Sequence, residues 1–380
     1  MPPQSDTPHI PALPKNESLE PPPVSLSPVA SIAPPLLPSE EKLPQPEPFI
    51  FHGRAAEYFR IWIVNTLLTI LTVGIFAAWA KVRKRRYLRG STEILGHRFD
   101  YRADPKRLLI GNLIIVTLFL AYSVLGSIYP VMRTGSIVVA VVLLPWIVAR
   151  SLAFNAHNTA YRGMRFRFKP QLSPAVMVWI FKPILIVLTL GFYYPAWVRD
   201  RKHYVITNHR LGTGYFYFNG SSGPFYLAYL LAGMLVIIAA GAGSVAVNVM
   251  QSGPRHAAPG LWQLLPFFAI YGTALFTAKH YIHAKLFNHV WNHTRLDDHR
   301  FLAKMDIGRW LGLQYTNILA VIGTCGLLYP WAVIRSMRYT ASCMHLLPAG
   351  SIDNIERLGR SDGSAVGDTA AEFIGLDFGL

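Results

Sequence analysis

One stretch occurs three times in this chain and strongly constrains its fold. Each copy begins with an apolar run, passes a glycine and ends in a basic, aromatic segment: residues 72–87, 189–204 and 324–339. Aligned without a gap, the copies share a glycine and a final tyrosine: Gly74, Gly191 and Gly326, then Tyr87, Tyr204 and Tyr339. Self-similarity of this kind indicates a fold assembled from repeated units. We expect a bend at each glycine.

The composition is typical of a membrane protein. Of the 380 residues, 52% are hydrophobic and 15% charged, with a mean hydropathy of +0.30, whereas about a quarter of an average soluble protein is charged. Crossing a bilayer takes roughly 20 apolar residues. Four stretches fit as crossing helices: 108–129, 135–149, 225–249 and 261–284. We therefore predict a polytopic membrane protein.

Charge is unevenly distributed along the chain. The net charge is +16, but segments 1–48 and 350–380 together hold 4 basic and 12 acidic residues, which leaves +24 on residues 49–349. In a membrane protein such an excess is typical of Lys and Arg retained on the cytoplasmic side, so we expect no nucleic acid partner. The Pro-rich segment 1–48 is predicted to be a disordered cytoplasmic tail, and 350–380 a flexible C-terminal tail.

Short polar units separate the apolar segments. They contain Thr92, Asn158, Thr159, Asn208 and Asn292. Alternating aromatic residues beside them, as in 99–101 and 166–168, favour short extended segments. The Thr and Asn side chains either cap helices or line a polar chamber near the membrane surface. The order of segments predicts a membrane domain at 49–349 with two and a half repeats: about 49–170, about 171–305 and a half repeat at about 306–349.

The three bent elements fit the membrane in two ways. If all three cross, the chain has seven crossings, and the Lys and Arg residues outside the membrane divide 18 to 13 between its sides. If each enters and leaves on the same side, four helices cross and 29 basic residues lie inside, with Arg133 and Arg255 outside. The second count fits the positive-inside preference better. We therefore favour re-entrant or interfacial elements, with both termini in the cytoplasm.

Several of these segments resemble a known family. Phe51-His-Gly53, Glu57-Tyr-Phe59, Leu71-Thr-Val-Gly74 and Ala78-Trp79-Ala-Lys-Val-Arg83, with Leu190-Gly191 and Tyr329-Pro-Trp331 further on, are similar to the YjgN family of bacterial inner-membrane proteins. The resemblance covers about residues 49–349. It implies a multi-pass protein of the bacterial inner membrane and brings no established activity. The third element departs from the first, with Ser336 and Met337 in place of Lys84 and Arg85.

Basic and aromatic side chains at the ends of the bent elements form the first candidate site. They either orient the chain or bind anionic solutes and lipid headgroups, because each cation near an anionic leaflet contributes ~1 kcal/mol. The candidates are Arg83, Arg86, Tyr87, Arg201, Tyr204, Arg335, Arg338 and Tyr339. Lys182 is a further candidate, because an ionisable residue at membrane depth is functional by default. At an interface it would instead extend to the headgroups.

Catalytic motifs are absent from the sequence. There is no Gly-x-Ser-x-Gly elbow and no phosphate-binding Gly-Lys-Ser/Thr loop, and Cys325 and Cys343 match no metal or disulfide spacing. Within a histidine-rich stretch at 280–299, His289 and His293 are four residues apart and share a helix face. They are weak candidates for a metal site. We expect no catalytic residue, no cofactor and no bound metal.

The predicted fold is an all-α membrane protein. It is a polytopic helical bundle in which Gly-bent elements and transmembrane helix pairs alternate with short extended polar units. The first functional hypothesis is transport, or a channel-like role, for an anionic or polar solute that enters from a basic cytoplasmic vestibule. The alternatives are a protein of the cytoplasmic leaflet that binds anionic phospholipids or acts as a scaffold, and a membrane-embedded metal-dependent enzyme. The sequence leaves the oligomeric state open.

Overall fold

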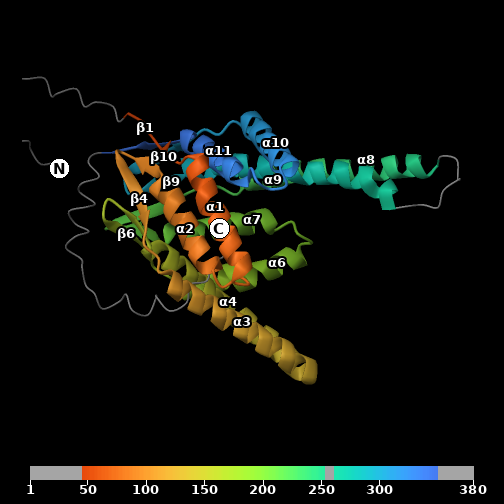
Figure 1. Ribbon diagram of the computed structural model, residues 1–380, viewed down its shortest axis with the longest axis horizontal. Helices are drawn as coiled ribbons and strands as arrows, with labels where there is room; N and C mark the ends of the chain where they lie inside the picture. The colour runs from red at the N-terminus through yellow and green to blue at the C-terminus, as the bar shows by residue number, and fades with distance from the viewer. Residues whose placement is uncertain (1–44, 253–260, 350–380) are drawn as a thin grey trace, which may run out of the picture. The chain divides into compact units, whose positions relative to one another are not determined.

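The computed structural model describes residues 45–252 and 261–349, which all belong to one unit of the chain. Most of these residues are helical (Figure 1). The helices come in five successive pairs: α1 (Ala55–Leu71) with α2 (Ala77–Gly90); α3 (Pro105–Ile128) with α4 (Pro130–His157); α5 (Leu172–Val176), η1 (Met177–Phe181) and α6 (Lys182–Leu188) with α7 (Tyr194–Thr207); α8 (Gly223–Gln251) with η2 (Leu261–Leu264) and α9 (Leu265–Asn292); α10 (Ile307–Gly323) with α11 (Tyr329–Ser342).

Short strands between the helix pairs join into one antiparallel sheet. They are β1 (Glu47–Pro48), β2 (Ile50–Phe51), β3 (Thr92–Ile94), β4 (His97–Tyr101), β5 (Thr159–Tyr161), β6 (Met164–Phe168), β7 (His209–Leu211), β8 (Gly214–Phe218), β9 (Thr294–Leu296), β10 (His299–Ala303) and β11 (Met344–Leu347). Their order is β1-β11-β10-β9-β8-β7-β6-β5-β4-β3-β2. Because only Phe49 separates β1 from β2, the two edges of the sheet meet and the sheet forms a ring.

The interior of this ring is a hydrophobic core. Successive side chains of a strand point to opposite faces, so every second residue of each hairpin enters the core. Four phenylalanines in equivalent positions, Phe99, Phe166, Phe216 and Phe301, stack with centroids 6.3–6.4 Å apart. Buried aliphatic residues from the same strands fill the remaining space. Aromatic pairs across neighbouring strands stabilise a sheet by roughly 0.2–1 kcal/mol each.

The prediction of an all-α helical bundle is therefore wrong. The segments predicted as extended polar units are the hairpins of an eleven-stranded sheet, counted over the described residues. Each strand has two to five residues, so the alternating pattern predicts short extended segments but is too short to predict a sheet of many strands. Each hairpin also pairs with hairpins that a helix pair separates from it in the chain, and such pairing leaves no local signal.

Every helix pair starts and ends at this sheet. The strand before each pair is hydrogen-bonded to the strand after it, as β4 is to β5 and β8 is to β9. Both ends of a helix pair therefore lie side by side on the ring. The helices extend from it, and Figure 1 shows α8 and the pair α3–α4 reaching farthest from the strands.

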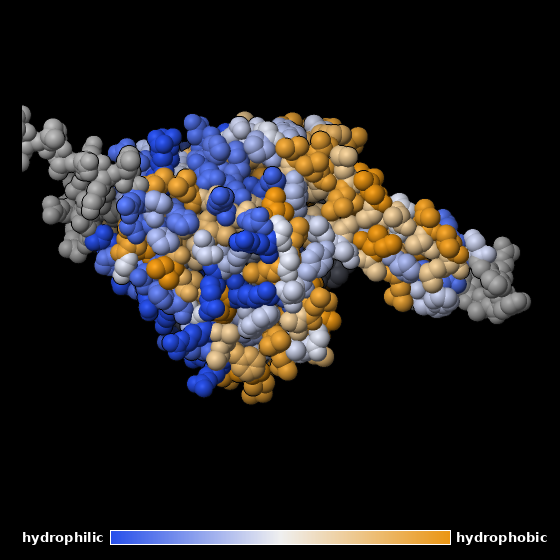
Figure 2. All heavy atoms as spheres, turned by 90° about the horizontal axis from the view of Figure 1, so that it is seen from above, coloured by the Kyte–Doolittle hydropathy of each residue, from blue (hydrophilic) through white to orange (hydrophobic). Residues whose placement is uncertain are grey.

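Three helices of the described chain are long and apolar enough to cross a membrane, by length and composition. They are α3, residues Thr134–His157 of α4, and α8. These coincide with three of the four stretches predicted to cross. The fourth, 261–284, lies in η2 and α9, which carries Lys279 and Lys285 in its second half. Figure 2 shows apolar side chains gathered over the projecting α8–α9 end, whereas hydrophilic ones gather around the sheet.

The predicted tails fall mostly outside this description. Segment 350–380 and residues 1–44 of the predicted tail 1–48 lie outside the described residues. Residues 45–48 are described, and they include β1, which pairs with β11 through Glu47 and Pro48.

Candidate functional site: polar pairs in three bent hairpins

Three of the helix pairs turn at the aligned glycines. We call α1–α2, α5–α7 and α10–α11 the first, middle and last hairpins. Their bend glycines, Gly74, Gly191 and Gly326, have φ angles of +89°, +92° and +92°, a left-handed conformation that glycine adopts without steric cost. Each glycine N–H donates to a carbonyl five residues back, at 2.7–2.8 Å, as in the C-terminal motif that ends many helices.

A threonine two residues before each glycine stabilises the bend from inside. The Thr72 hydroxyl donates to the Leu68 carbonyl over 2.7 Å and accepts from the Phe76 N–H over 2.9 Å. Thr189 and Thr324 make the same two bonds. One hydroxyl therefore links the last turn of one helix to the first turn of the next, and this local hydrogen bonding stabilises the bend.

The tyrosines that end the repeated stretch close each hairpin at the sheet. Their hydroxyls donate to the carbonyl of the residue just before the opposite helix: Tyr87 to Arg54 over 3.0 Å, Tyr204 to Gln171 over 3.3 Å, and Tyr339 to Asp306 over 3.1 Å. These three tyrosines were predicted as anion or headgroup ligands. In the structure their hydroxyls tie the two ends of a hairpin together, and their binding of anions or headgroups stays a prediction.

The five predicted arginines do not meet in one site. Arg83 lies over the Phe76 ring at 5.3 Å and Arg201 over the Trp197 ring at 4.9 Å. Arg86, Arg335 and Arg338 donate to Tyr101, to Thr316 and to Gly53, respectively. Their charges are therefore distributed over three hairpins.

A pair of positions symmetric about each bend does hold a polar contact. Nine residues before the glycines come Asn65, Lys182 and Asn317, and nine residues after them come Arg83, Asp200 and Arg335. In the last hairpin, Arg335 donates to the Asn317 side-chain oxygen over 3.1 Å. In the middle hairpin the charges are exchanged, and Lys182 forms an ion pair with Asp200.

The ion pair of the middle hairpin is largely buried. The side chains of Lys182 and Asp200 are 24% and 15% exposed, and Arg199 adds a second cation 3.0 Å from the other Asp200 oxygen. Charges removed from water persist where they are paired and hydrogen-bonded. The Lys182 ammonium, predicted as a lone ionisable group at membrane depth, thus has a specific counter-charge on the returning helix.

A π-helical turn positions Lys182. Pro183 has no N–H, so the Trp179 carbonyl has no donor four residues on, and the chain widens into η1, where the Lys182 N–H reaches back to Met177. The Val178 carbonyl accepts instead from the Trp197 indole of α7 over 2.7 Å. Turns of this kind occur often at functional sites. Through the Trp197 hydrogen bond, the π-helical turn just before Lys182 is attached to α7, the helix that carries Asp200.

A pocket of about 470 Å³ opens beside this ion pair. Its walls come from α5, η1, α6 and α7, and they combine apolar side chains with Lys182, Arg199, Asp200 and His203. The two cations outnumber the single carboxylate, so the pocket favours an anionic or polar group. A small solute with a carboxylate or phosphate fits this chemistry.

The predicted Thr and Asn residues of the polar units lie at helix ends. Thr92 donates to the Leu88 carbonyl, Asn158 to Phe154, Thr159 to Asn155 and Asn208 to Tyr204, all four residues back. Asn292 exchanges two hydrogen bonds with the backbone of Ala303. These side chains terminate helices and attach them to strands, which is the capping alternative of the sequence analysis. They do not converge on one chamber.

The two histidines considered for a metal do lie together. The rings of His289 and His293 are 4.3 Å apart between centroids. His289 Nε2 contacts the Ser221 carbonyl and His293 Nδ1 contacts the His289 carbonyl. Within residues 45–252 and 261–349, no group of three His, Cys, Asp or Glu side chains could hold a metal ion.

The sequence carries a signal for both members of the key pair, although only Lys182 was predicted. When residues are compared by their distance from the bend glycine, Lys182 occupies the position of Asn317, and Asp200 occupies the position of Arg335. The cation therefore lies before the bend in the middle hairpin and after it in the last. Aligning the three copies by their Gly and Tyr residues places Asp200 at the position of Arg83 and Arg335 and does not indicate its partner.

Sequence relatives of this chain are bacterial. The family model described as "Bacterial protein of unknown function (DUF898)" matches residues 46–373. Proteins named "Inner membrane protein YjgN" are 33% identical over 144 residues in Escherichia coli O157:H7 and strain K12, and 28% identical over 142 residues in Salmonella typhimurium. These matches cover 37–38% of this chain and 36% of the length of each relative. No solved structure matches.

Proposed function

This chain belongs to the DUF898 family of bacterial proteins, as the resemblance to YjgN predicts, and we propose that it is a multi-pass inner-membrane protein that transports a polar or anionic solute. The relatives are named inner-membrane proteins, and three apolar helices of spanning length agree with an integral membrane protein. The transported solute would bind in the pocket beside Lys182 and Asp200.

The proposed topology follows from the attachment of each helix pair to the ring. Because both ends of every pair lie at the sheet, a pair that crosses the membrane also returns. The longer pairs, α3–α4 and α8–α9, would span, and the three bent hairpins would enter and leave on one side. The ring and both ends of the described chain would then lie in the cytoplasm, the side that retains most Lys and Arg.

Exposure at the bends supports insertion of the hairpins. Val73 is 93% exposed and Leu190 is 90% exposed, each directly before a bend glycine. Leu71 and Phe192 flank these bends and are 82% and 77% exposed. Contiguous exposed apolar surface of this kind marks a membrane or partner contact. Within a bilayer, the local hydrogen bonds of the bends would satisfy the backbone as lipid requires.

One observation carries the proposal for transport, namely the Lys182–Asp200 pair and its pocket in a hairpin that we place in the membrane. Ionisable groups at membrane depth are costly and typically mark substrate or ion pathways. An entering anion can compete with Asp200 for Lys182 and Arg199. The site then has two states: in one the two cations contact Asp200, and in the other they contact the solute.

A second candidate function, a lipid-binding or scaffold protein of the cytoplasmic leaflet, is favoured by the ring. The interior of the ring is filled by a hydrophobic core, so a solute could not pass through the ring and would have to pass between helices. A filled ring to which every helix pair is attached is suited to a scaffold. We do not propose a metal-dependent enzyme, because the described residues offer no group of three potential ligands.

Flux measurements test the transport proposal. Purified protein in liposomes would be assayed with radiolabelled phosphate, succinate and glutamate. We expect saturable uptake of at least one of these anions, a loss of about tenfold or more in Lys182→Gln, as expected when a buried charged contact is removed, and retention in Lys182→Arg. Uptake equal to that of empty liposomes for every probe would exclude transport of these anions and favour the lipid-binding alternative.

A further inference from the structure

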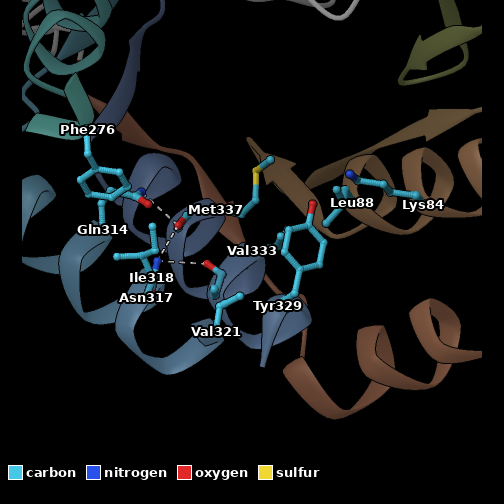
Figure 3. A pocket seen from close by; sticks show the side chains of 12 residues that line it. Lys84, Leu88, Phe276, Gln314, Asn317, Ile318, Val321, Tyr329, Val333 and Met337 are labelled. Carbon is cyan, nitrogen blue, oxygen red and sulfur yellow. Dashed lines mark hydrogen bonds between the residues drawn. The ribbon is translucent and has the colours of Figure 1, made fainter. Parts of the chain in front are cut away.

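Two pockets that share Lys84 lie at the first and last hairpins, apart from the middle hairpin, and together we call them the groove. One, of about 390 Å³, is formed mainly by α10 and α11, with Phe276 of α9 (Figure 3). The other, of about 360 Å³, is formed by α1 and α2. Lys84 lines both pockets, and the Trp62 and Tyr329 rings, whose centroids are 6.2 Å apart, pack between the two hairpins.

The pocket formed by α1 and α2 contains a buried acceptor that lacks a donor among the described residues. Asn65 is 6% exposed, and its side-chain oxygen has no hydrogen-bond partner among the described residues. Its counterpart in the last hairpin, Asn317, accepts from Arg335. In the first hairpin the equivalent arginine, Arg83, lies over the Phe76 ring instead. An unpartnered buried polar atom is costly, so a ligand that donates a hydrogen bond to Asn65 is favoured.

The same groove contains a cation that is free to bind an anion. Lys84 makes no hydrogen bond or ion pair within the described part of the chain. Figure 3 shows its amino end pointing toward the hydroxyl of Tyr329, across the pocket from Asn317. Phosphate groups are well suited to such an ammonium group.

Apolar side chains complete the walls. Trp62 and Ile70 line one pocket, and Ile318, Val321 and Val333 line the other. Ile70 is 70% exposed, so the groove continues onto the apolar surface of the hairpin. The ligand therefore needs a polar end with both a hydrogen-bond donor and a negative charge, together with an apolar body that follows the helices.

We infer that the groove between the first and last hairpins binds an anionic glycerophospholipid whose headgroup carries a hydroxyl. Its phosphate would pair with Lys84, a headgroup hydroxyl would donate to Asn65, and its acyl chains would lie against the apolar walls. This inference depends on the proposed membrane location of the hairpins. It does not depend on transport through the middle hairpin.

Native mass spectrometry of the full chain tests this site. The protein would be released from detergent in the presence of phosphatidylglycerol and phosphatidylcholine with identical acyl chains. We expect preferential retention of phosphatidylglycerol, reduced about fivefold in Lys84→Gln, because one basic contact to an anionic lipid is removed. Asn65→Leu should also reduce the preference, because the site then lacks its acceptor.

Two controls make the result decisive. Arg83→Gln removes a neighbouring charge outside both pockets and should leave the preference intact. Equal losses in Arg83→Gln and Lys84→Gln, or wild-type retention in both Lys84→Gln and Asn65→Leu, would overturn the site. Soluble glycerol phosphate should not displace the lipid, and displacement at equal concentration would reassign the groove to a soluble phosphate ester. Anion uptake measured on the same preparations shows separately whether the transport proposal fails.

Discussion

The middle and last hairpins share one bend but hold different polar pairs across it. Both turn at a left-handed glycine, both use a threonine hydroxyl inside the bend, and both end in a tyrosine that contacts the opposite helix. Nine residues from the bend, the last hairpin pairs Asn317 with Arg335, whereas the middle hairpin pairs Lys182 with Asp200. The same bend therefore accommodates different polar pairs at these positions, with the cation before the bend in the middle hairpin and after it in the last.

The first hairpin shows what happens when the pair is not made. It has the same bend, yet Asn65 lacks a donor within the part of the chain that the structure describes, and Arg83 contacts an aromatic ring. The three hairpins thus contain a buried ion pair, a neutral–cationic pair and an unpaired acceptor at one equivalent position. The backbone bend is the same in all three hairpins, so the different side-chain contacts at this position identify the chemistry specific to each hairpin. The ion pair of the middle hairpin and the unpaired acceptor of the first hairpin adjoin the two proposed binding sites.

The largest expected effect comes from breaking the ion pair. In Asp200→Ala the Lys182 ammonium loses its main counter-charge in a largely buried position, and we expect the free energy of unfolding to fall by about 2 kcal/mol, less than for a fully buried pair. The double variant Lys182→Asn with Asp200→Arg copies the last hairpin and should recover most of that loss. Denaturant titration in detergent measures both. A double variant no more stable than Asp200→Ala would show that the hairpins are not interchangeable.

A smaller effect separates the last hairpin from the first. Asn317→Leu removes the acceptor of Arg335 and the donor to Ser336, and we expect a loss of ~1–2 kcal/mol. The matched change Asn65→Leu removes an acceptor that has no partner, so stability should change by less than about 0.5 kcal/mol or rise slightly. Equal losses in the two variants, read from the same titrations, would mean that Asn65 is satisfied in the folded protein.

The sequence predicted the helices better than the sheet that holds them. Apolar runs of spanning length appear directly in composition, and three of four predicted crossings match helices that are long and apolar enough. The ring was missed because its contacts are distant in the chain. The alternation around Phe99 and Phe166 predicted short extended segments, but no local pattern shows that these two stack with Phe216 and Phe301 in a common core.

The candidate site was predictable in part. Lys182 was singled out because a charge among apolar neighbours is conspicuous, whereas its partner Asp200 lies in a basic segment and is recognised only across the bend. The arginines and tyrosines were grouped because they recur together. Recurrence reflected a shared structural role for the tyrosines, which tie helix ends together.

The bend itself supplies a prediction common to all three hairpins. At Gly326 an added Cβ meets nothing within 4 Å, so the cost of Gly326→Ala is conformational and amounts to roughly 1–2 kcal/mol for a residue held in the left-handed region. Gly312→Ala, in the helical interior of α10 with equally open surroundings, should instead stabilise by ~0.5–1 kcal/mol. Opposite signs in thermal unfolding are expected. A neutral Gly326→Ala would show that the bend tolerates another conformation.

The smallest expected effect is a pH dependence of stability that comes from the ring and not from the hairpins. Burial lowers the pKa of His299 in β10 below its usual 6.5, although Asp297 and Asp298 act in the opposite direction, and His299 Nδ1 accepts from the Ala349 N–H over 3.0 Å. As the pH falls through 6.5, His299 therefore binds a proton in the unfolded chain but not in the folded chain. The contribution of neutral His299 to the free energy of unfolding is complete above pH 6.5 and is lost as the pH falls below it.

Thermal midpoints between pH 7.5 and 5.5 measure this loss. His299→Gln should flatten the profile without abolishing its slope, because burial also lowers the pKa of His209 in β7. The exchanged variant, Lys182→Asn with Asp200→Arg, should keep the wild-type slope, because it leaves His299 and His209 of the ring unchanged. A slope that changes with the hairpin variant but not with His299→Gln would assign the pH dependence to the hairpin and contradict the separation drawn here.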